Sequence, residues 1–400
     1  MKVRDHANKS NIFDDLFILE MANNHWGSLD RGKRIIRSFA QIVRKHGVKA
    51  AIKMQFRDVD TFIHPDFRGD EERYIKKTEL TQLSIDDFCE LSELIAREGC
   101  IPMATPFDEK SVGLCEDLKY KIIKIASSDI NDWNLLNRIS VANRPVIIST
   151  GGAKEHQIDA AVLFFNQMNI PLAINHCVSL YPSDDDQLEL SQIDYLKSRY
   201  PDNVIGLSTH ECTDWSSSLL MSYAKGARTW ERHIDIEDGE RKVSPYCSLP
   251  HQIDEWFCAY KKAKEMNGST LDSRRHICQK ETDYLNNLAR GIYARGKVPR
   301  GTIINDKNFH KYFFLAVPLQ RGQLSGRENI CGARIARNLQ QGEGLFIGSV
   351  GNLDYLNINT GEIINRGRKT THQEAFEAPP ADTKNLNQAY MTKLHIRMAQ

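Results

Sequence analysis

Two histidines and one glutamate are placed where a divalent metal ion could be held. Each lies at or just after the end of a short apolar run: Glu20 on the first run, His210 on the seventh and His233 on the eighth. If these runs close into a parallel barrel, the seventh, eighth and first strands are neighbours, and their ends meet at one rim. Two imidazoles with oxygen donors suit a catalytic ion with open coordination positions. A hydrogen-bonded histidine without a metal is the common alternative for either residue alone, but their joint placement favours the metal.

Two lysines and several hydroxyl groups indicate a pocket for an anion. Lys53 and Gln55 occupy alternating positions of the second run, so both side chains point into the predicted barrel. Lys124 lies on the fourth run. The hydroxyl groups at the ends of other runs are those of Thr105, Ser127, Ser149 and Ser208. Because an uncompensated buried lysine is costly, two inward lysines predict a bound phosphate or carboxylate.

The elements that must position these side chains alternate from about residue 16 to residue 266. Short apolar or β-branched runs are typical of buried parallel strands, and amphipathic stretches between them predict helices. The predicted strands are Phe17–Met21, Ala50–Phe56, Ile101–Thr105, Lys121–Ala126, Val146–Thr150, Leu172–His176, Val204–Ser208 and Thr229–His233. The predicted helices include Asp30–His46, Ser84–Glu98, Glu155–Gln167, Leu190–Arg199, Trp215–Lys225 and Pro250–Met266. This pattern favours a (β/α)8 TIM barrel over a doubly wound open sheet, since no GxGxxG follows the first strand.

The composition limits the class of protein. The chain has 400 residues, with 53 Lys+Arg against 52 Asp+Glu and a net charge of +1, which argues against a nucleic-acid-binding surface over the whole chain. No run approaches 18 apolar residues, so we expect no membrane span, and the first residues lack the apolar stretch of a secretory signal. The nine cysteines are scattered without CxxC pairs. We therefore expect a reduced, cytoplasmic protein without a disulfide framework or zinc knuckle.

The sequence also changes character along its length. We expect the barrel over residues 14–266, a polar linker over 267–288 and a small β-rich module over 289–350, where β-like pieces alternate with Gly and Pro. Within this module, Ile292–Arg295 and Ile335–Arg337 resemble each other, which suggests an internal duplication. Residues 351–400 form a polar C-terminal tail to which no role is assigned.

A short segment with polar residues lies on or just after each predicted strand. In chain order these are Phe17–Gly27, Lys53–Phe56, Ala104–Asp108, Lys124–Ser127, Ile148–Gly151, His176-Cys177 with Tyr181-Pro182, Gly206–His210 and Glu231–His233. Together they resemble the sialic acid synthase family, which makes N-acetylneuraminate and related nonulosonic acids. The resemblance covers about residues 14–350, and it implies that residues 289–350 are the C-terminal SAF (antifreeze-like) domain of that family.

The resemblance implies a reaction, a cofactor and an assembly. Family members condense phosphoenolpyruvate with an open-chain 2-acetamido sugar, using Mn2+ or a similar divalent ion such as Mg2+ or Co2+. By this resemblance His210 and His233 would hold the ion, and Glu20 would position water or move protons beside it. The residues that would hold phosphoenolpyruvate are Lys53, Gln55, Thr105, Lys124, Ser127, Ser149 and Ser208. Asp129 and Tyr181 match sugar-side positions, and the family forms a domain-swapped homodimer whose SAF domain covers the partner's barrel mouth.

The departures from the family pattern lie mainly on the sugar side. Lys242–Pro245 stands where the family has Gly-Pro-Asp-His, and Val317–Leu319 replaces Arg-Pro-Gly, so Arg321 or Arg327 would have to reach the sugar. We therefore expect a phosphoenolpyruvate-dependent synthase, a transferase forming a C–C bond, with a modified acceptor preferred over N-acetylmannosamine. One alternative is a non-catalytic member that binds a sugar or anion and regulates or scaffolds a partner. Another is a synthase of a 3-deoxy-2-keto sugar phosphate, against which the expected SAF domain argues.

Overall fold

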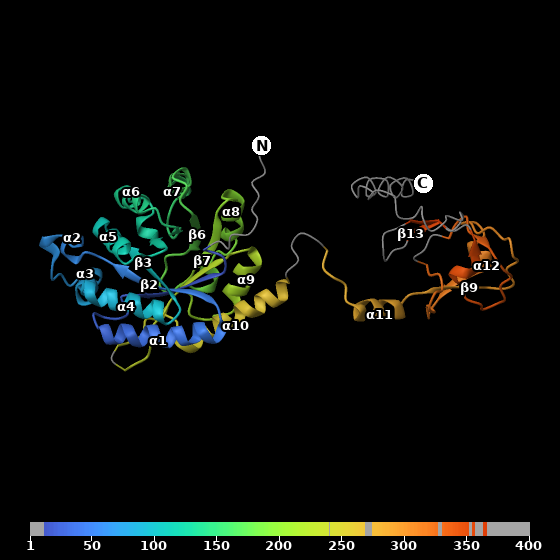
Figure 1. Ribbon diagram of the computed structural model, residues 1–400, viewed down its shortest axis with the longest axis horizontal. Helices are drawn as coiled ribbons and strands as arrows, with labels where there is room; N and C mark the ends of the chain where they lie inside the picture. The colour runs from blue at the N-terminus through green and yellow to red at the C-terminus, as the bar shows by residue number, and fades with distance from the viewer. Residues whose placement is uncertain are drawn as a thin grey trace. The chain divides into compact units, whose positions relative to one another are not determined.

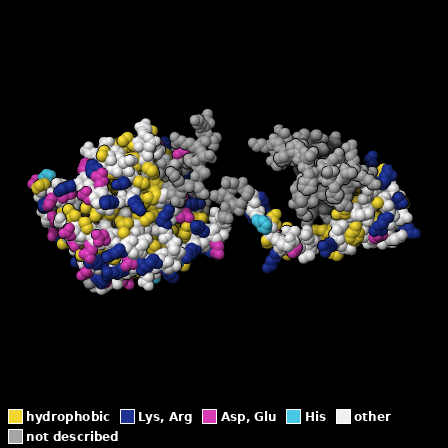
Figure 2. All heavy atoms as spheres, viewed as in Figure 1, with side chains coloured by type: hydrophobic (Ala, Val, Ile, Leu, Met, Phe, Trp, Pro, Cys, Tyr) yellow, Lys and Arg dark blue, Asp and Glu magenta, His cyan; other side chains and the backbone are white. Residues whose placement is uncertain are grey.

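The computed structural model describes residues 12–239, 241–268, 274–326, 330–351, 354–356 and 363–365. The chain divides into two compact units, Met1–Ser269 and Thr270–Gln400 (Figure 1). Almost all of the predicted tail, and Arg327 with it, lies outside the described residues. On the face shown in Figure 2, basic and acidic side chains are intermixed over the first unit, in keeping with the near-neutral net charge.

The first unit is built on a closed barrel of parallel strands in the order β1 to β8, with β8 paired to β1. The strands are β1 (Leu16–Ala22), β2 (Lys49–Phe56), β3 (Ile101–Pro106), β4 (Ile123–Ile125), β5 (Val146–Ser149), β6 (Leu172–Cys177), β7 (Val204–Ser208) and β8 (Thr229–His233). The predicted TIM barrel is therefore confirmed. The fourth strand is shorter at both ends than expected, and at its carboxyl end this is because the chain turns into a 3-10 helix, η2 (Ser127–Asp129).

Helices surround the strands, as Figure 1 shows. They are α1 (Leu29–His46), α2 (Val59–Phe62), α3 (Arg73–Leu80), α4 (Ile85–Arg97), α5 (Glu109–Asp117), α6 (Trp133–Ala142), α7 (Glu155–Gln167), α8 (Gln192–Arg199), α9 (Ser217–Lys225) and α10 (Pro250–Asn267), with short 3-10 turns η1 (Pro65–Phe67) and η3 (Asp185–Gln187). Local signals fix several ends. The Ser28 hydroxyl accepts from the Arg31 N–H at the start of α1, and Gly47 ends it in the left-handed region at φ 62°. Among the described residues, none of the helices is long and apolar enough to cross a membrane.

Alternation along the strands separates two buried layers. On β1, Phe17 and Leu19 belong to the large core between sheet and helices. Leu16 and Ile18 belong to a second cluster, which fills the inside of the barrel together with Met103 and corresponding apolar residues of other strands. The next inward position after Ile18 is that of Glu20, at the carboxyl end. Apolar side chains therefore fill the interior of the barrel, and the charged side chains form the next layer, at the carboxyl ends of the strands.

The second unit is small and rich in β structure. It contains α11 (Gln279–Asn287), β9 (Gly291–Ala294), α12 (Phe309–Tyr312), β10 (Phe313–Ala316), β11 (Arg334–Ile335), η4 (Ile347–Ser349), β12 (Val350–Gly351), β13 (Asp354–Leu356) and β14 (Ile363–Asn365). The strands form antiparallel pairs. Ile292 and Ile335, from the two stretches that resemble each other, both lie in its apolar core. The expected linker carries helix α11, and the domain boundaries and the SAF assignment stay predictions.

Candidate active site

A cavity of about 610 Å3 opens at the carboxyl ends of the barrel strands. It brings together eleven of the thirteen site residues predicted from the sequence. These are Glu20, Lys53, Gln55, Thr105, Lys124, Ser127, Ser149, Tyr181, Ser208, His210 and His233. They come from all eight strands or from the loops that follow them. Because a barrel directs the loops that follow its strands to one face, residues far apart in sequence share one site.

The base of the cavity is a buried cluster of charges around Lys53. In the strand register Glu20 lies opposite both Lys53 of β2 and His233 of β8. The Lys53 ammonium forms an ion pair with Glu20, lies 3.3 Å from Glu231 Oε1 and donates to Thr105 Oγ1 at 2.8 Å. Burial lowers the pKa of Lys53 to about 8, although Glu231 favours its charged form. Lys53 is thus a cation whose charge is costly to keep unless anions remain beside it.

Glu231 is a site residue that the sequence prediction missed. Both it and His233 lie on β8 two positions apart, so they point to the same side of the strand, and both line the cavity. Burial raises the pKa of Glu231, but the ammonium groups of Lys53 and Lys124 outweigh it and hold this pKa below its usual value. Glu231 Oε2 and Glu20 Oε1 have no hydrogen-bond partner among the described residues, whereas Glu20 Oε2 is the oxygen that pairs with the Lys53 ammonium. The alternation that placed Lys53 and Gln55 inside the barrel was also the signal for Glu231.

The two histidines lie close together, and both are held in the neutral form that binds metal ions. Their ring centroids are 5.5 Å apart. His210 Nδ1 lies 3.0 Å from the Val178 carbonyl oxygen, to which it donates when it carries the proton, leaving the Nε2 lone pair available. Burial lowers the pKa of His210 to about 4, and burial together with His210 holds the pKa of His233 well below its usual value. Two neutral imidazoles, with Glu20 Oε1 and Glu231 Oε2 as carboxylate oxygens that have no partner among the described residues, fit a divalent ion.

The cavity wall next to β4 and β5 is formed by hydroxyl groups that lie close to the backbone of Gly151. Ser127 Oγ accepts from the Gly151 N–H at 3.1 Å, and Ser149 Oγ has no hydrogen-bond partner in the described part of the chain. A Cβ atom on Gly151 would lie 2.1 Å from Ser179 Oγ and 2.9 Å from Ser127 Oγ. Only glycine leaves room for these hydroxyls, so the wall keeps small polar groups that suit a phosphate or carboxylate.

Two predicted sugar-side residues are not brought into this cavity. Asp129 ends η2, and the described lining includes its neighbours Ser128 and Ile130 but not Asp129 itself. Burial raises the pKa of Asp129. Arg321 lies in the second unit, exposed on a turn. Both assignments stay predictions.

Gln55 is held by an arginine that the sequence prediction also missed. Arg57 Nη1 donates to Gln55 Oε1 at 3.0 Å, and its guanidinium lies 3.7 Å from the centroid of the Phe107 ring. Burial lowers the pKa of Arg57 to about 10, against the opposing effect of the nearby carboxylate of Asp129. The amide of Gln55 therefore has a fixed orientation at the cavity wall, with its NH2 group left for a ligand.

Two aromatic rings lie beside the histidines, and of these Tyr181 lines the cavity while Tyr246 packs against it and against His233. The Tyr181 centroid lies 4.0 Å from that of His210 and 5.2 Å from that of Tyr246, which in turn lies 5.2 Å from His233. Tyr181 is 51% exposed, so its ring is accessible from solvent. Tyr246 was not predicted, because it lies in a segment after β8 without regular secondary structure, where no periodicity indicates a direction.

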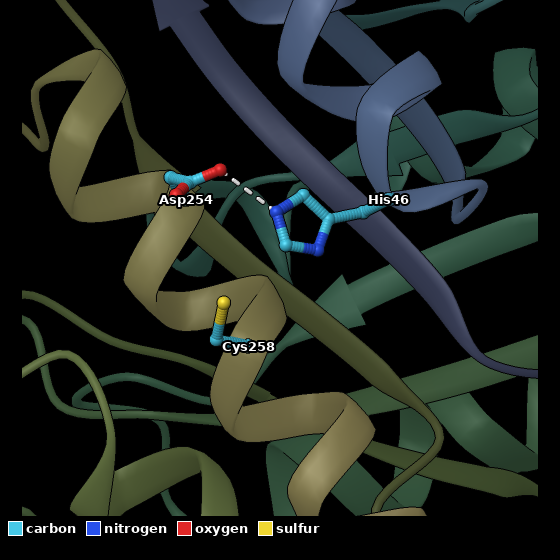
Figure 3. A group of neighbouring side chains, drawn as sticks. All are labelled: His46, Asp254 and Cys258. Atoms are coloured by element: carbon cyan, nitrogen blue, oxygen red, sulfur yellow. Dashed lines mark hydrogen bonds and ion pairs between the residues drawn. The ribbon is translucent and has the colours of Figure 1, made fainter.

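A second group of metal-binding residue types lies outside this cavity. His46 at the end of α1 faces Asp254 on α10, with Nε2 2.8 Å from Oδ1, and Cys258 follows one turn later (Figure 3). The Lys45 ammonium lies 2.6 Å from the same Asp254 oxygen. Asp254 is therefore already neutralised, and we assign no ion to this group.

The fold and the cavity first define a class: a TIM barrel whose mouth combines paired histidines, carboxylates and lysines. The NeuB family model matches residues 42–271, more than half of the chain. The chain therefore belongs to the NeuB family, which confirms the resemblance to sialic acid synthases.

Known proteins are similar over much of the chain. A solved structure described as spore coat polysaccharide biosynthesis protein E, from Chromobacterium violaceum, has a TM-score of 0.79 and 32% identity, covering 84% of this chain and 99% of that chain. Pseudaminic acid synthase from Campylobacter jejuni is 26% identical over 304 residues, 73% of this chain and 84% of the relative. N-acetylneuraminate-9-phosphate synthase from Drosophila melanogaster is 27% identical over 254 residues, 60% of this chain and 66% of the relative.

Proposed function

We propose that the protein condenses phosphoenolpyruvate with the open-chain aldehyde of a 2-acetamido sugar, giving a nonulosonic acid and phosphate. Membership of the NeuB family and relatives that are named as synthases of such acids support this reaction. The observation that carries the proposal is the cluster of His210, His233, Glu20, Glu231 and Lys53 in one cavity. Such a cluster can bind an anion, a divalent ion and a polarised carbonyl together.

The charges at the base of the cavity argue for a divalent ion as part of the site. Glu20 and Glu231 contribute two negative charges, Lys53 and Lys124 two positive charges, and the histidines are neutral, so the sum is zero. A divalent ion on His210 and His233 would leave a net charge of about +2. That excess suits phosphoenolpyruvate, which carries both a phosphate and a carboxylate. We propose Mn2+, with Mg2+ or Co2+ as substitutes.

In this proposal the residues hold the anion and move protons. Lys53, Lys124 and the hydroxyls of Ser127 and Ser149 bind phosphoenolpyruvate, and Gln55 lies beside it. The bound ion supplies polarisation of the aldehyde oxygen. C3 of phosphoenolpyruvate forms the new bond to the aldehyde carbon, water adds at C2, and phosphate leaves by cleavage of the C2–O bond. Glu20 takes the proton that the water loses and passes it to the former aldehyde oxygen, which becomes a hydroxyl, and the new C2 hydroxyl gives its proton to the departing phosphate. The buried Glu20 carboxylate can serve in this way because its Oε1 has no hydrogen-bond partner among the described residues.

The aromatic ring of Tyr181 supports a modified acceptor over plain N-acetylmannosamine. Tyr181 lines the cavity next to both histidines, with Tyr246 packed against it, and such a ring packs against apolar parts of a ligand. An additional acetamido methyl or a deoxygenated carbon would find apolar contact there. From the family resemblance we also propose a swapped homodimer in which Arg321 of one chain contacts the sugar bound in the other.

The test is a coupled assay for phosphate released from phosphoenolpyruvate with Mn2+ and a panel of 2-acetamido and diacetamido hexoses. Phosphoenolpyruvate labelled with 18O at the C2–O bridge should deliver the label to phosphate, and mass spectrometry should give a product with the acceptor carbons plus three. His233→Ala serves as the inactive control. Metal-loaded protein that releases no phosphate with any aldehyde would contradict the proposal and favour a binding protein.

A further inference from the structure

Each of the two histidines has a charged neighbour in sequence, and these neighbours form an ion pair. Glu211 follows His210, and Arg232 precedes His233. Arg232 Nη1 lies 2.6 Å from Glu211 Oε1, and both side chains are 1% exposed. Because side chains alternate along β8, Arg232 points away from the barrel interior that His233 faces. In the described lining of the cavity neither residue appears, so the pair lies behind the wall that carries the histidines.

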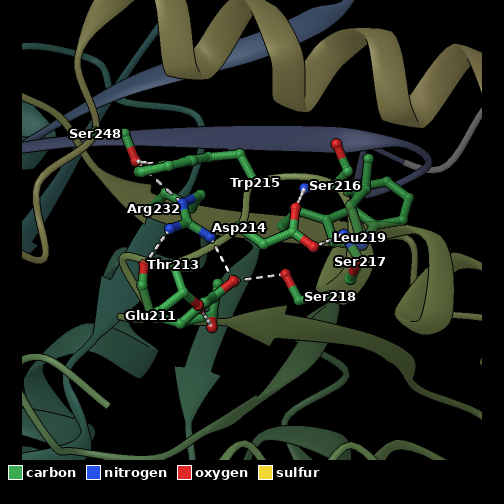
Figure 4. Close-up of polar contacts among 12 residues, drawn as sticks. Glu211, Thr213, Asp214, Trp215, Ser216, Ser217, Ser218, Leu219, Arg232 and Ser248 are labelled. Carbon is green, nitrogen blue, oxygen red and sulfur yellow. Dashed lines mark hydrogen bonds and ion pairs between the residues drawn. The ribbon is translucent and has the colours of Figure 1, made fainter. Parts of the chain in front are cut away.

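The guanidinium of Arg232 joins three segments at once (Figure 4). Besides the Glu211 carboxylate, it donates from Nη2 to the Glu211 carbonyl oxygen and from Nε to Ser248 Oγ at 3.1 Å. Ser248 Oγ also accepts from Trp215 Nε1 at 2.9 Å. The contact to a main-chain carbonyl fixes the backbone next to His210, not only a side chain.

Glu211 and Ser248, at the two ends of this network, make further hydrogen bonds. Ser218 Oγ donates to Glu211 Oε1 at 2.5 Å, and the Thr209 hydroxyl donates to Glu211 Oε2. The Ser248 N–H donates to the His233 carbonyl oxygen at 2.7 Å. The residues on both sides of His210 and the backbone of His233 are thus connected through Arg232, Glu211 and Ser248.

A buried ion pair of this kind is not explained by stability. Removing two charges from water costs about as much as their attraction returns, and apolar residues of the same volume often serve as well. What the planar guanidinium adds is a rigid fork with directed N–H groups. A metal site needs its ligands held within about 0.5 Å of the productive geometry. A fork that joins the segments carrying both ligands is suited to that task.

We propose that Glu211 and Arg232 are positioning residues that set the separation of His210 and His233 for the divalent ion. This inference rests on the metal role proposed above, and it adds that the binding geometry is imposed from behind the wall by a pair that touches no ligand. Residues that orient metal ligands in this way change metal affinity by about 10- to 100-fold when they are replaced.

The test compares three variants of the full-length protein, together with His210→Ala as the variant that lacks a metal ligand, after removal of metal. Arg232→Lys keeps the charge and loses the fork, and Glu211→Gln keeps the shape and loses the charge. Arg199→Lys is the matched control, since Arg199 forms a similar two-bond contact, at 2.8 and 2.6 Å, with Asp159 on the outside of the barrel. Mn2+ affinity is measured by calorimetry, coordination geometry by the visible absorption of bound Co2+, and folding by thermal unfolding and circular dichroism.

We expect the Mn2+ dissociation constant to rise about 10- to 100-fold in Arg232→Lys and Glu211→Gln, with altered Co2+ bands, while the control matches the parent. A folded variant of either kind with parental affinity and unchanged bands would overturn this inference alone. A parent that binds Mn2+ no better than His210→Ala would overturn the proposed metal role and this inference together. If Arg232→Lys does not fold, the isosteric Glu211→Gln decides the outcome.

Discussion

At the scale of single residues, Lys53 has the least ordinary environment, because its ammonium is buried between two carboxylates. Its pKa is about 8 in the folded protein against 10.5 ordinarily, with burial as the main cause. Between these pH values the unfolded chain holds more protons than the folded one. This group therefore adds stability as the pH rises from about 8 to 10.5, while the folded site loses a cation over the same range.

The affinity for phosphoenolpyruvate should fall as Lys53 loses its positive charge. We expect the dissociation constant, measured by calorimetry without acceptor, to rise above pH 8 and approach about tenfold per pH unit. Lys53→Met should bind weakly with a flat profile, because it has no charge to lose. Lys110→Met, which removes an exposed lysine paired with Asp58, is the control and should keep the parental profile. A parental protein with constant affinity between pH 7 and 10 would exclude Lys53 as the anion-binding cation.

Glu231 is the second residue whose role can be separated by kinetics. Glu231→Gln removes a negative charge from the base of the cavity and keeps the shape of the side chain. We expect kcat to fall by about 100-fold or more, with no rise in KM for phosphoenolpyruvate, because the anion then meets less repulsion. Glu255→Gln, at an exposed glutamate that accepts from Ser216, is the matched control. A rise in KM at constant kcat would instead make Glu231 a binding residue.

At the scale of elements, alternation along strands predicts most of the site, and it fails where the strands stop. Glu20, Lys53 and the β8 histidine follow directly from a period of two in buried parallel strands. Asp129 does not follow, since it lies in the 3-10 helix η2, where three residues per turn carry it away from the described lining. Tyr246 lies in an irregular segment whose path depends on long-range contacts that no local pattern encodes.

The turn after β5 provides the prediction that belongs to this scale. Gly151→Ala would place a Cβ atom 2.1 Å from Ser179 Oγ, so the hydroxyls of this wall must shift. We expect a loss of stability of about 1–3 kcal/mol and a KM for phosphoenolpyruvate raised about tenfold. Thermal unfolding and initial rates measure both effects. Gly113→Ala is the control, because its nearest foreign atom would be 3.8 Å away. It should leave KM unchanged and, since Gly113 lies inside helix α5, raise stability by about 0.5–1 kcal/mol instead of lowering it.

At the scale of the whole molecule, the family resemblance makes a prediction about which chain completes which site. A swapped homodimer, as proposed above, would bring Arg321 of one chain to the sugar bound in its partner's barrel. Arg321→Ala should then raise KM for the acceptor, leave the affinity for phosphoenolpyruvate unchanged and differ from Arg334→Ala, an exposed arginine of the same unit. The swap itself needs a separate measurement, since an unswapped protein would respond in the same way to this substitution.

Complementation between two defective chains distinguishes the two assemblies. His233→Ala inactivates the barrel, and Arg321→Ala impairs the second unit, so neither chain alone should use the acceptor efficiently. In a swapped dimer of both chains, the intact barrel receives the intact second unit of its partner. About one quarter of the parental activity should return on co-expression, because half of the dimers are mixed and each has one complete site. Without a swap, every intact barrel keeps its own impaired second unit, and mixed dimers should recover no activity beyond that of Arg321→Ala.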